Sequence, residues 1–458
     1  MTTVKNPALL SAQENLRPTS AMTGTSVNVG EVFRVMPLTS RHWLVGAVLF
    51  IAFVIEAWEM MVLILAGDMI AGDLHLSTAQ LGNLFSSIYI GMVPGCLVWG
   101  KLADSIGRKK TLVWSLVLYG VMSAVSAFSH SFGMLWWTRL ASGIALSGVM
   151  VAPFIHLEEL LPVKYRGRGA VVLAAGWPVG LLLAIGVVHL LRGTNWHIIL
   201  AVSSLAGLWA IGVQKIVPES PYWSASKNKE ELASRSIATL YGSQAPPFPA
   251  NTRFTVDNFE QGSFVRLFEP VLRMATVQQL LMNAVMAFST WALTAWLPRL
   301  LADRGLSVGD GDTFLTFTAI IMFPGYLTAS WATGKFGRRR VMAVFVAFAA
   351  IFSFSFAFSR TLWQMYLSSA GLFFFNQGAW GVWDTWMGEL YPTSVRGVGY
   401  SLGLTMQRVA NSLAPLVIGI LLARRASFSF VVCFIACFLV LALFISLFIR
   451  ETEGVVLG

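Results

Sequence analysis

The amino-acid sequence predicts an all-α polytopic membrane protein, with 12 transmembrane helices in two pseudo-symmetric six-helix halves. Its 458 residues are 56% hydrophobic and 12% charged, whereas soluble proteins average about 25% charged residues. The mean hydropathy is +0.68, and apolar runs of about 20 residues, long enough to cross a bilayer, recur along the whole chain. A pair of repeated motifs divides these runs into two sets.

The apolar runs place six spans in each half. The first six are 43–66, 79–100, 111–129, 132–155, 168–191 and 196–217. The second six are 273–297, 313–334, 340–358, 362–387, 399–422 and 428–449. We therefore expect an N-terminal tail (1–42), a first bundle (43–217), a solvated linker with one amphipathic helix (218–270), a second bundle (271–450) and a C-terminal tail (451–458).

The basic residues indicate the orientation in the membrane. Arg139 and Arg408 fall inside predicted spans, and six of the 32 Lys and Arg residues lie in the loops of one side, namely Arg192, Arg299, Arg304, Arg360, Arg424 and Arg425. All the others lie on the opposite side. Because basic loops stay in the cytoplasm, both termini are expected there, with the protein in the plasma membrane (the inner membrane of a Gram-negative cell). The net charge of +10 is then explained by the basic loops that set the orientation in the membrane, and no nucleic-acid partner is expected.

Two motifs recur at the same offset along the chain. The loop Gly100–Lys110 (GKLADSIGRKK) is echoed by Gly334–Arg340 (GKFGRRR), so Gly107 and Arg108 correspond to Gly337 and Arg338. Glu159-Leu160-Leu161-Pro162 with Arg166 likewise corresponds to Glu389-Leu390-Tyr391-Pro392 with Arg396. Repeated halves that rock around a site at the bilayer midplane are typical of secondary transporters.

These residues resemble the major facilitator superfamily. GKLADSIGRKK is similar to the signature loop between helices 2 and 3, and Arg139 with Gly143 and Gly148 resembles the helix 4 signature. Pro218-Glu219-Ser220-Pro221 and the Glu389 motif are similar to the branch of sugar porters, organic ion transporters and aromatic acid:proton symporters. The resemblance implies alternating access, with a cytoplasmic gate formed by Gly100, Asp104, Gly107, Arg108, Glu159, Arg166, Arg338, Glu389 and Arg396.

Two acids in the first span are candidates for proton coupling. Ionisable groups inside a bilayer are costly and call for an explanation. Glu56 and Glu59 are three residues apart, which places both carboxylates on one helix face, where repulsion and burial favour a bound proton. The position resembles the Asp-x-x-Asp of aromatic acid:proton symporters, with Glu in both places. Arg139 lies at a similar depth, about 10 Å, and is expected to keep Glu59 ionised; an inert structural pair is the alternative.

Arg408 is the candidate anion site. It lies near the middle of its predicted span, between Gln407 and Asn411, and a guanidinium there stays charged and binds a carboxylate through two parallel hydrogen bonds. In related organic ion transporters, a cationic residue in this region accompanies anionic substrates. Asp384 is the alternative partner for Arg408, and the two pairings could alternate during transport.

Aromatic and amide side chains complete the predicted substrate site. Trp380 and Trp383 are candidate walls for a planar acid, although aromatic stripes more often serve packing. Gln279 and Asn283 resemble the Gln-Gln and Asn pattern of sugar porters. The Asn is displaced by one residue and the Tyr-Tyr pair is missing, which weakens a sugar interpretation.

The sequence thus predicts a proton-coupled symporter that imports a small organic anion, an aromatic acid or another carboxylate, and functions as a monomer. The alternatives are a proton-driven exporter of drugs or metabolites, or a sugar or polyol porter. A sensor would need a signalling domain that the tail and linker do not provide. No P-loop, serine nucleophile or metal-ligand cluster is found, and the three cysteines lie in apolar segments. Neither enzymatic activity nor a metal or other cofactor is therefore expected.

Overall fold

The computed structural model describes residues 26–242, 248, 252–256, 264–305, 308–391 and 395–452. The helices of the first half are α3 (Ser40–Leu65), α4 (Gly67–Asp73), α5 (Thr78–Ile106), α6 (Arg108–Ser126), α7 (Phe132–Leu160), α8 (Arg166–Ala174), α9 (Gly176–Leu191), α10 (Trp196–Ser204) and α11 (Trp209–Ile216). Those of the second half are α14 (Arg273–Ala302), α15 (Val308–Phe336), α16 (Arg338–Ala357), α17 (Leu362–Glu389), α18 (Arg396–Ala423) and α19 (Phe428–Phe448).

The predicted fold class is confirmed, because these helices supply the twelve predicted spans. The fifth span is divided into α8 and α9 beside Gly176-Trp177-Pro178, and the sixth into α10 and α11 with a short 3₁₀ segment between them. Among the described residues, ten helical segments are long and apolar enough to cross a bilayer. The other two spans are α6, which begins with three basic residues, and α17, which carries polar residues such as Asp384.

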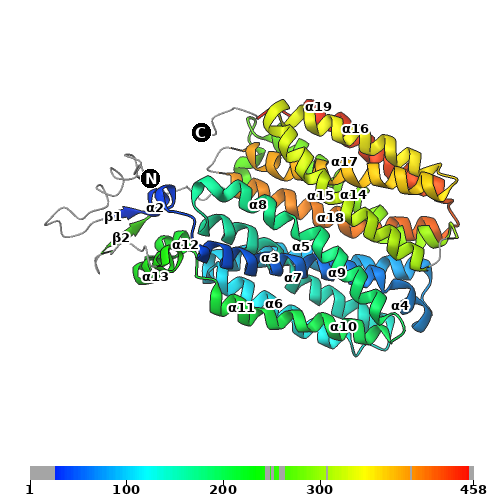
Figure 1. Cartoon of the computed structure of the whole chain (residues 1–458), viewed down its shortest axis with the longest axis horizontal. Coiled ribbons are helices and arrows are strands. Elements are labelled where there is room, and N and C mark those ends of the chain that lie inside the picture. The colour runs from blue at the N-terminus through cyan, green and yellow to red at the C-terminus, as the bar shows by residue number, and fades with distance from the viewer. Residues whose placement is uncertain are drawn as a thin grey trace, which may run out of the picture.

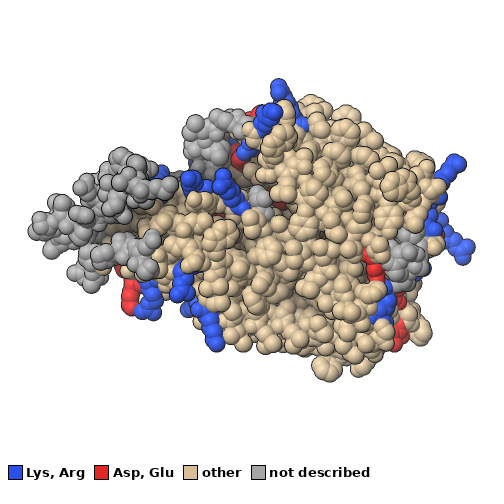
Figure 2. All heavy atoms as spheres, viewed as in Figure 1, with Lys and Arg blue, Asp and Glu red and all other residues tan. Residues whose placement is uncertain are grey.

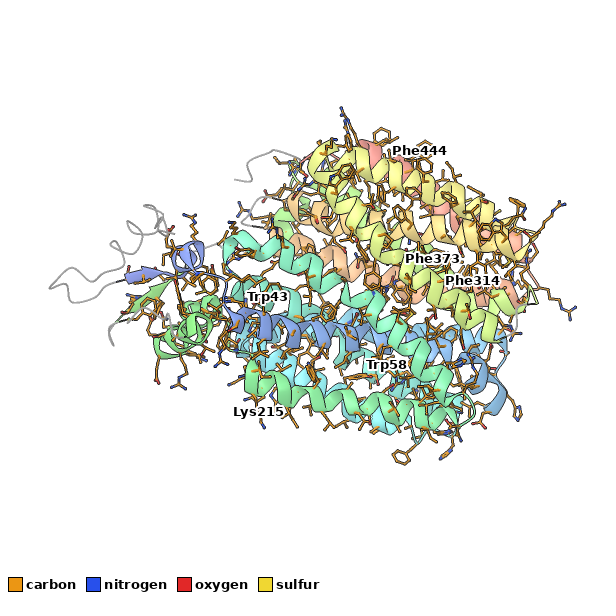
Figure 3. All side chains as sticks on the ribbon, in the orientation of Figure 1. Trp43, Trp58, Lys215, Phe314, Phe373 and Phe444 are labelled. Atoms are coloured by element: carbon orange, nitrogen blue, oxygen red, sulfur yellow. The ribbon has the colours of Figure 1, made fainter. Side chains whose placement is uncertain are left out.

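The surface of the bundle suits a bilayer. Figure 2 shows Lys, Arg, Asp and Glu gathered at the two ends of the bundle, with a broad uncharged surface between them. Large apolar side chains on this belt point outward, among them Trp43 and Phe444, whereas Trp58 and Phe314 are buried inside the two halves (Figure 3). This is the distribution of a multi-pass membrane protein, in which lipid replaces water around the middle of the molecule.

The two halves lie side by side along the same axis, with α3 beginning and α19 ending at one end of the bundle (Figure 1). We call this the terminal end and the other the far end. The halves meet closely where α5 crosses α18, because Gly82 has no side chain: a Cβ there would lie 2.7 Å from the Pro415 carbonyl oxygen and 3.2 Å from Gly419 Cα. Small residues permit such close helix contacts in membranes.

A small module covers the terminal end of the first half (Figure 1). It consists of β1 (Ser26–Asn28), paired in parallel with β2 (Arg253–Thr255), and of α2 (Val29–Val35), α12 (Pro221–Ser226) and α13 (Glu230–Tyr241). The sequence predicts a polar tail and a linker with one helix, so the strands, α2 and α12 are additions. They form because a few apolar residues in these polar stretches, such as Val29, Phe33 and Phe254, bury one another.

Candidate functional site

A buried ion pair lies inside the first half. Arg139 on α7 donates to Glu59 on α3, and both side chains are fully buried. The remaining Arg139 donors reach Ser126 and Ser142, and the second Glu59 oxygen accepts the Tyr119 hydroxyl at 2.5 Å. Both oxygens of Glu59 therefore have a partner, which is the condition under which a buried charge is tolerated.

The neighbouring acid on α3 contacts the other half of the molecule. Glu56 Oε1 lies 3.6 Å from Arg408 Nη2 on α18, and the two side chains are 2% and 6% exposed. Among the described residues, neither Glu56 Oε1 nor Arg408 Nε has a hydrogen-bond partner. The sequence places Glu56 and Glu59 on one helix face, yet the structure gives them different partners, Glu59 within its own half and Glu56 across the interface.

Arg408 is surrounded by weak partners. Apart from Glu56, its guanidinium contacts the sulfur of Met150 and lies 4.0 Å from the sulfur of Met60. A thioether is only a weak acceptor, while a guanidinium carries five N–H donors. The Asp384 alternative is not formed here: within the described part of the chain, Asp384 is half-buried and the ion pair of Arg408 is with Glu56. Arg408 is thus a buried cation with unused donors at the boundary between the halves.

Further polar atoms at this boundary also have no partner. The Tyr89 hydroxyl on α5 and Asn411 Oδ1, one turn after Arg408 on α18, are buried and unpaired among the residues that the structure describes. An unsatisfied buried polar group costs about 1–3 kcal/mol. Buried polar groups are normally satisfied by a protein group, a ligand or water, so this boundary between the halves is the candidate binding site.

The other predicted substrate residues support one another inside the second half. Asn283 on α14 accepts hydrogen bonds from Gln407 at 2.8 Å and from Trp383 at 3.0 Å. Gln279 donates to the Gly399 carbonyl at 2.9 Å and accepts the Tyr391 hydroxyl at 2.6 Å. Their polar groups are therefore engaged in holding α14, α17 and α18 together.

The two tryptophans predicted as walls differ in their position. Trp383 is completely buried among the helices of the second half, where its indole N–H donates to Asn283. Trp380 is only half-buried, and its indole N–H donates to Thr290 Oγ1 at 2.9 Å. Of the pair, Trp380 is the one that is partly exposed.

The repeated motifs make equivalent contacts at the terminal end of the two halves. Arg108 pairs with Asp104 at 3.1 Å and binds both oxygens of Glu159 at 3.1 and 3.2 Å. In the second half, Arg338 pairs with Glu389 at 2.9 Å. These pairs each stay within one half, so the predicted gate is not joined through them in this conformation.

The glycines of the two loops have a defined role. Gly107 and Gly337 adopt φ angles of 104° and 84°, which favour glycine. Glu219 accepts the backbone N–H of Lys109, and Glu451 accepts that of Arg338, each at 3.0 Å. The two carboxylates thus cap α6 and α16, where the positive end of the helix dipole stabilises negative charge.

The remaining gate residues have different surroundings. Arg166 donates to the Tyr222 hydroxyl of α12 at 2.7 Å, which ties the gate region to the small module. A Cβ on Gly100 would meet open space. The side chain of Arg396 lies outside the described part of the structure.

Ion pairs join the two halves at the far end. Asp312 on α15 binds Arg192, which directly follows α9, at 2.7 and 3.1 Å and His189 on α9 at 2.6 Å. Arg299 on α14 lies 3.4 Å from Asp68 on α4. The sequence does not predict this cluster, because its members belong to no repeated motif; the only signal is that acids and bases occur in the loops of the same side.

Known proteins share this architecture. The family model described as sugar (and other) transporter matches residues 20–458. The chain belongs to this family of the major facilitator superfamily. This confirms the resemblance stated from the repeated motifs.

Curated relatives of this major facilitator are similar over most of their length. The niacin transporter NiaP of Acinetobacter baylyi is 26% identical over 385 residues, covering 84% of this chain and 88% of that protein. The cis,cis-muconate transport protein of the same organism is 24% identical over 376 residues, covering 81% and 86%. The synaptic vesicle 2-related protein of Xenopus laevis is 26% identical over 413 residues, covering 83% and 73%.

Solved structures show the same fold. A partially occluded, inward-open conformation of the xylose transporter XylE from E. coli matches with a TM-score of 0.74 at 18% identity, covering 92% of this chain and all of XylE. XylE bound to 6-bromo-6-deoxy-D-glucose matches with a TM-score of 0.73. The family model makes this chain a transporter of the major facilitator superfamily, and the solved structures share its fold.

Proposed function

We propose that this major facilitator is a proton-coupled symporter that imports a small carboxylate by alternating access. The observation that carries the proposal is the contact between Glu56 of the first half and Arg408 of the second. When Glu56 is ionised, it neutralises Arg408. When Glu56 takes up a proton, Arg408 becomes an uncompensated buried cation and binds the carboxylate of the substrate, a strong charge-assisted interaction. Proton and anion therefore bind together.

The coupling follows from competition for one guanidinium. Binding of an anion without a proton would leave Glu56 and the substrate as two negative charges beside a single cation, which burial strongly disfavours. Loss of the proton on the alkaline side returns Glu56 to Arg408 and displaces the substrate. The net charge of the site stays the same in both states, and an inward proton gradient therefore drives uptake.

Glu59 and Arg139 have a supporting role in this scheme. Because both Glu59 oxygens are hydrogen-bonded, Glu59 stays ionised and paired, and it fixes the rotation of α3 that directs Glu56 toward Arg408. Of the two predicted proton carriers, Glu56 is then the one whose charge changes during transport.

The relatives favour a planar, unsaturated acid. Niacin, named for one relative, is a pyridine carboxylic acid, and cis,cis-muconate, named for another, is a conjugated dicarboxylate. Either would present Arg408 with a carboxylate and the surrounding side chains with a flat π-system. The distribution of basic residues supports a location in the plasma membrane with the terminal end in the cytoplasm. In the opposite conformation, the residues of the repeated ion pairs at that end form the cytoplasmic gate.

Uptake into proteoliposomes tests the proposal. The purified full chain is reconstituted, an inside-alkaline pH gradient is imposed, and radiolabelled nicotinate, benzoate, muconate, xylose and a cationic drug are offered separately. We expect the gradient to stimulate uptake of at least one carboxylate. It should not stimulate uptake of xylose or of the drug. Gradient-driven uptake of xylose alone, or efflux of the drug, would instead establish one of the two alternative transport functions.

A further inference from the structure

An aromatic cluster lies at the interface between the halves. Tyr89 comes from α5 and Trp177 from α9 in the first half, and Trp291 comes from α14 in the second. The Trp291 ring lies 5.1 Å from that of Tyr89 and 5.5 Å from that of Trp177, centroid to centroid. These separations are typical of attractive ring contacts. Trp291 thus bridges two aromatic side chains of the opposite half.

Tyr89 links this cluster to the charged pair. Its hydroxyl is buried without a hydrogen-bond partner among the described residues, and α5, which carries Tyr89, packs against α18, which carries Arg408. A buried tyrosine hydroxyl normally finds a partner. If Tyr89 served only to pack against Trp291, a phenylalanine would fill the same volume without leaving a polar atom unsatisfied.

We propose that Tyr89 and Trp291 determine substrate specificity: they bind the ring of an aromatic carboxylate, and the Tyr89 hydroxyl donates a hydrogen bond to an acceptor atom in that ring. This rests on the proposed function, because Arg408 must hold the carboxylate. The site then prefers a heteroaromatic acid, with a ring nitrogen that accepts a hydrogen bond, over a plain aromatic acid of the same size.

The preference follows from desolvation. A ligand with a ring acceptor satisfies the Tyr89 hydroxyl, whereas an all-carbon ring leaves it buried and unpaired. Sites built to hydrogen-bond a substrate reject analogues that lack the complementary atom. An unsatisfied group costs about 1–3 kcal/mol, which corresponds to a difference in affinity of about fivefold to 150-fold. Trp291 contributes ring contact to both kinds of ligand, so it affects affinity without affecting the preference.

Equilibrium binding of two matched acids tests this assignment. Nicotinate and benzoate have nearly the same shape, and they differ in one ring nitrogen. Their affinities are measured by calorimetry on the purified full chain at acidic pH, for the wild type, Tyr89→Phe and Trp291→Ala. The control is Tyr241→Phe, which removes a tyrosine hydroxyl from α13, far from the site in the sequence and in the fold.

We expect the wild type and Tyr241→Phe to bind nicotinate about tenfold or more tightly than benzoate. Tyr89→Phe should reduce nicotinate affinity to near that of benzoate and leave benzoate unchanged or tighter, while Trp291→Ala weakens both acids. Equal affinities in the wild type, or an unchanged preference in Tyr89→Phe, would overturn the assignment and leave the proposed symport intact. Absence of binding of every carboxylate would overturn both.

Discussion

Two glutamates one helical turn apart have different chemical environments. Glu59 is held by Arg139 and Tyr119 within the first half, while Glu56 faces Arg408 across the interface and has an oxygen without a hydrogen bond from the described residues. Burying an ionisable group in a membrane costs free energy, so a pair of buried acids calls for a functional explanation. In the proposed mechanism, Glu59 therefore has a structural role and Glu56 is the acid that changes charge during transport.

Glu56→Gln should abolish the pH dependence of substrate binding. In the wild type, affinity for nicotinate should fall as the pH rises, because ionised Glu56 competes for Arg408. A glutamine carries no charge, so the variant should bind at alkaline pH as tightly as the wild type does at acidic pH. Calorimetric titrations at several pH values measure this; parallel pH profiles of the two proteins would contradict the mechanism.

Arg408→Lys should weaken carboxylate binding about tenfold or more, because lysine is a point charge without the planar fork that binds both carboxylate oxygens. Arg360→Lys, in a loop of the far end, serves as the matched control and should bind like the wild type. Retained affinity in Arg408→Lys would show that bidentate binding is not used.

Sequence reasoning found most of the charged residues but not their partners. It identified Glu56, Glu59, Arg139 and Arg408 from their rarity inside apolar runs. It did not place Glu56 opposite Arg408, because the rotation of a helix and the approach of two halves depend on packing over many side chains. It also missed Tyr89, since a single tyrosine in an apolar run carries no distinguishing pattern.

At the scale of elements, the repeated loops combine a turn and a helix cap. The sequence predicts sharp glycine turns beside basic clusters, and the positive φ angles of Gly107 and Gly337 agree with this. It does not predict that Glu219 caps α6, because the two segments lie 110 residues apart. For a similar reason, the sequence does not predict the strands, α2 and α12 of the small module. Their core forms from short segments of the tail and the linker that meet only in the folded protein.

Gly107→Ala should lower the stability of the protein by about 1–3 kcal/mol, the range for a non-glycine residue in a strained conformation. The added Cβ would also lie 2.3 Å from Glu219 Oε2. Gly100→Ala is the control, because it lies in the last turns of α5 with open space around it and alanine favours a helix. Thermal unfolding followed by tryptophan fluorescence compares them, and equal midpoints would refute the role of Gly107.

At the scale of the whole molecule, ion pairs among the described residues join the two halves at the far end of the bundle. Asp312 bonds to Arg192 and His189 there, whereas the repeated pairs of Arg108 and Arg338 at the terminal end stay within their own halves. This arrangement fits a conformation that is closed at the far end. Motifs in the sequence predicted the superfamily and its two halves, but a sequence contains no signal for which state of the cycle is populated.

Asp312→Asn should favour opening at the far end. It weakens contacts to Arg192 and His189, and partly exposed ion pairs contribute up to about 1 kcal/mol each, so the open population should rise several-fold. Spin-label distances between the far ends of α9 and α15 report the change. Asp303→Asn is the control, because Asp303 pairs with Arg299 inside one half; the same shift in both variants would exclude a specific latch.

Proton movement during substrate uptake is the sharpest test of proton symport through Glu56. Nicotinate is added to proteoliposomes of the full chain in weakly buffered medium without an imposed gradient, and the external pH is followed. We expect the medium to become more alkaline in proportion to the nicotinate taken up, and we expect no such change with Glu56→Gln, although this variant still binds and exchanges the acid. Nicotinate uptake by the wild type without alkalinisation, or with acidification, would contradict proton symport through Glu56.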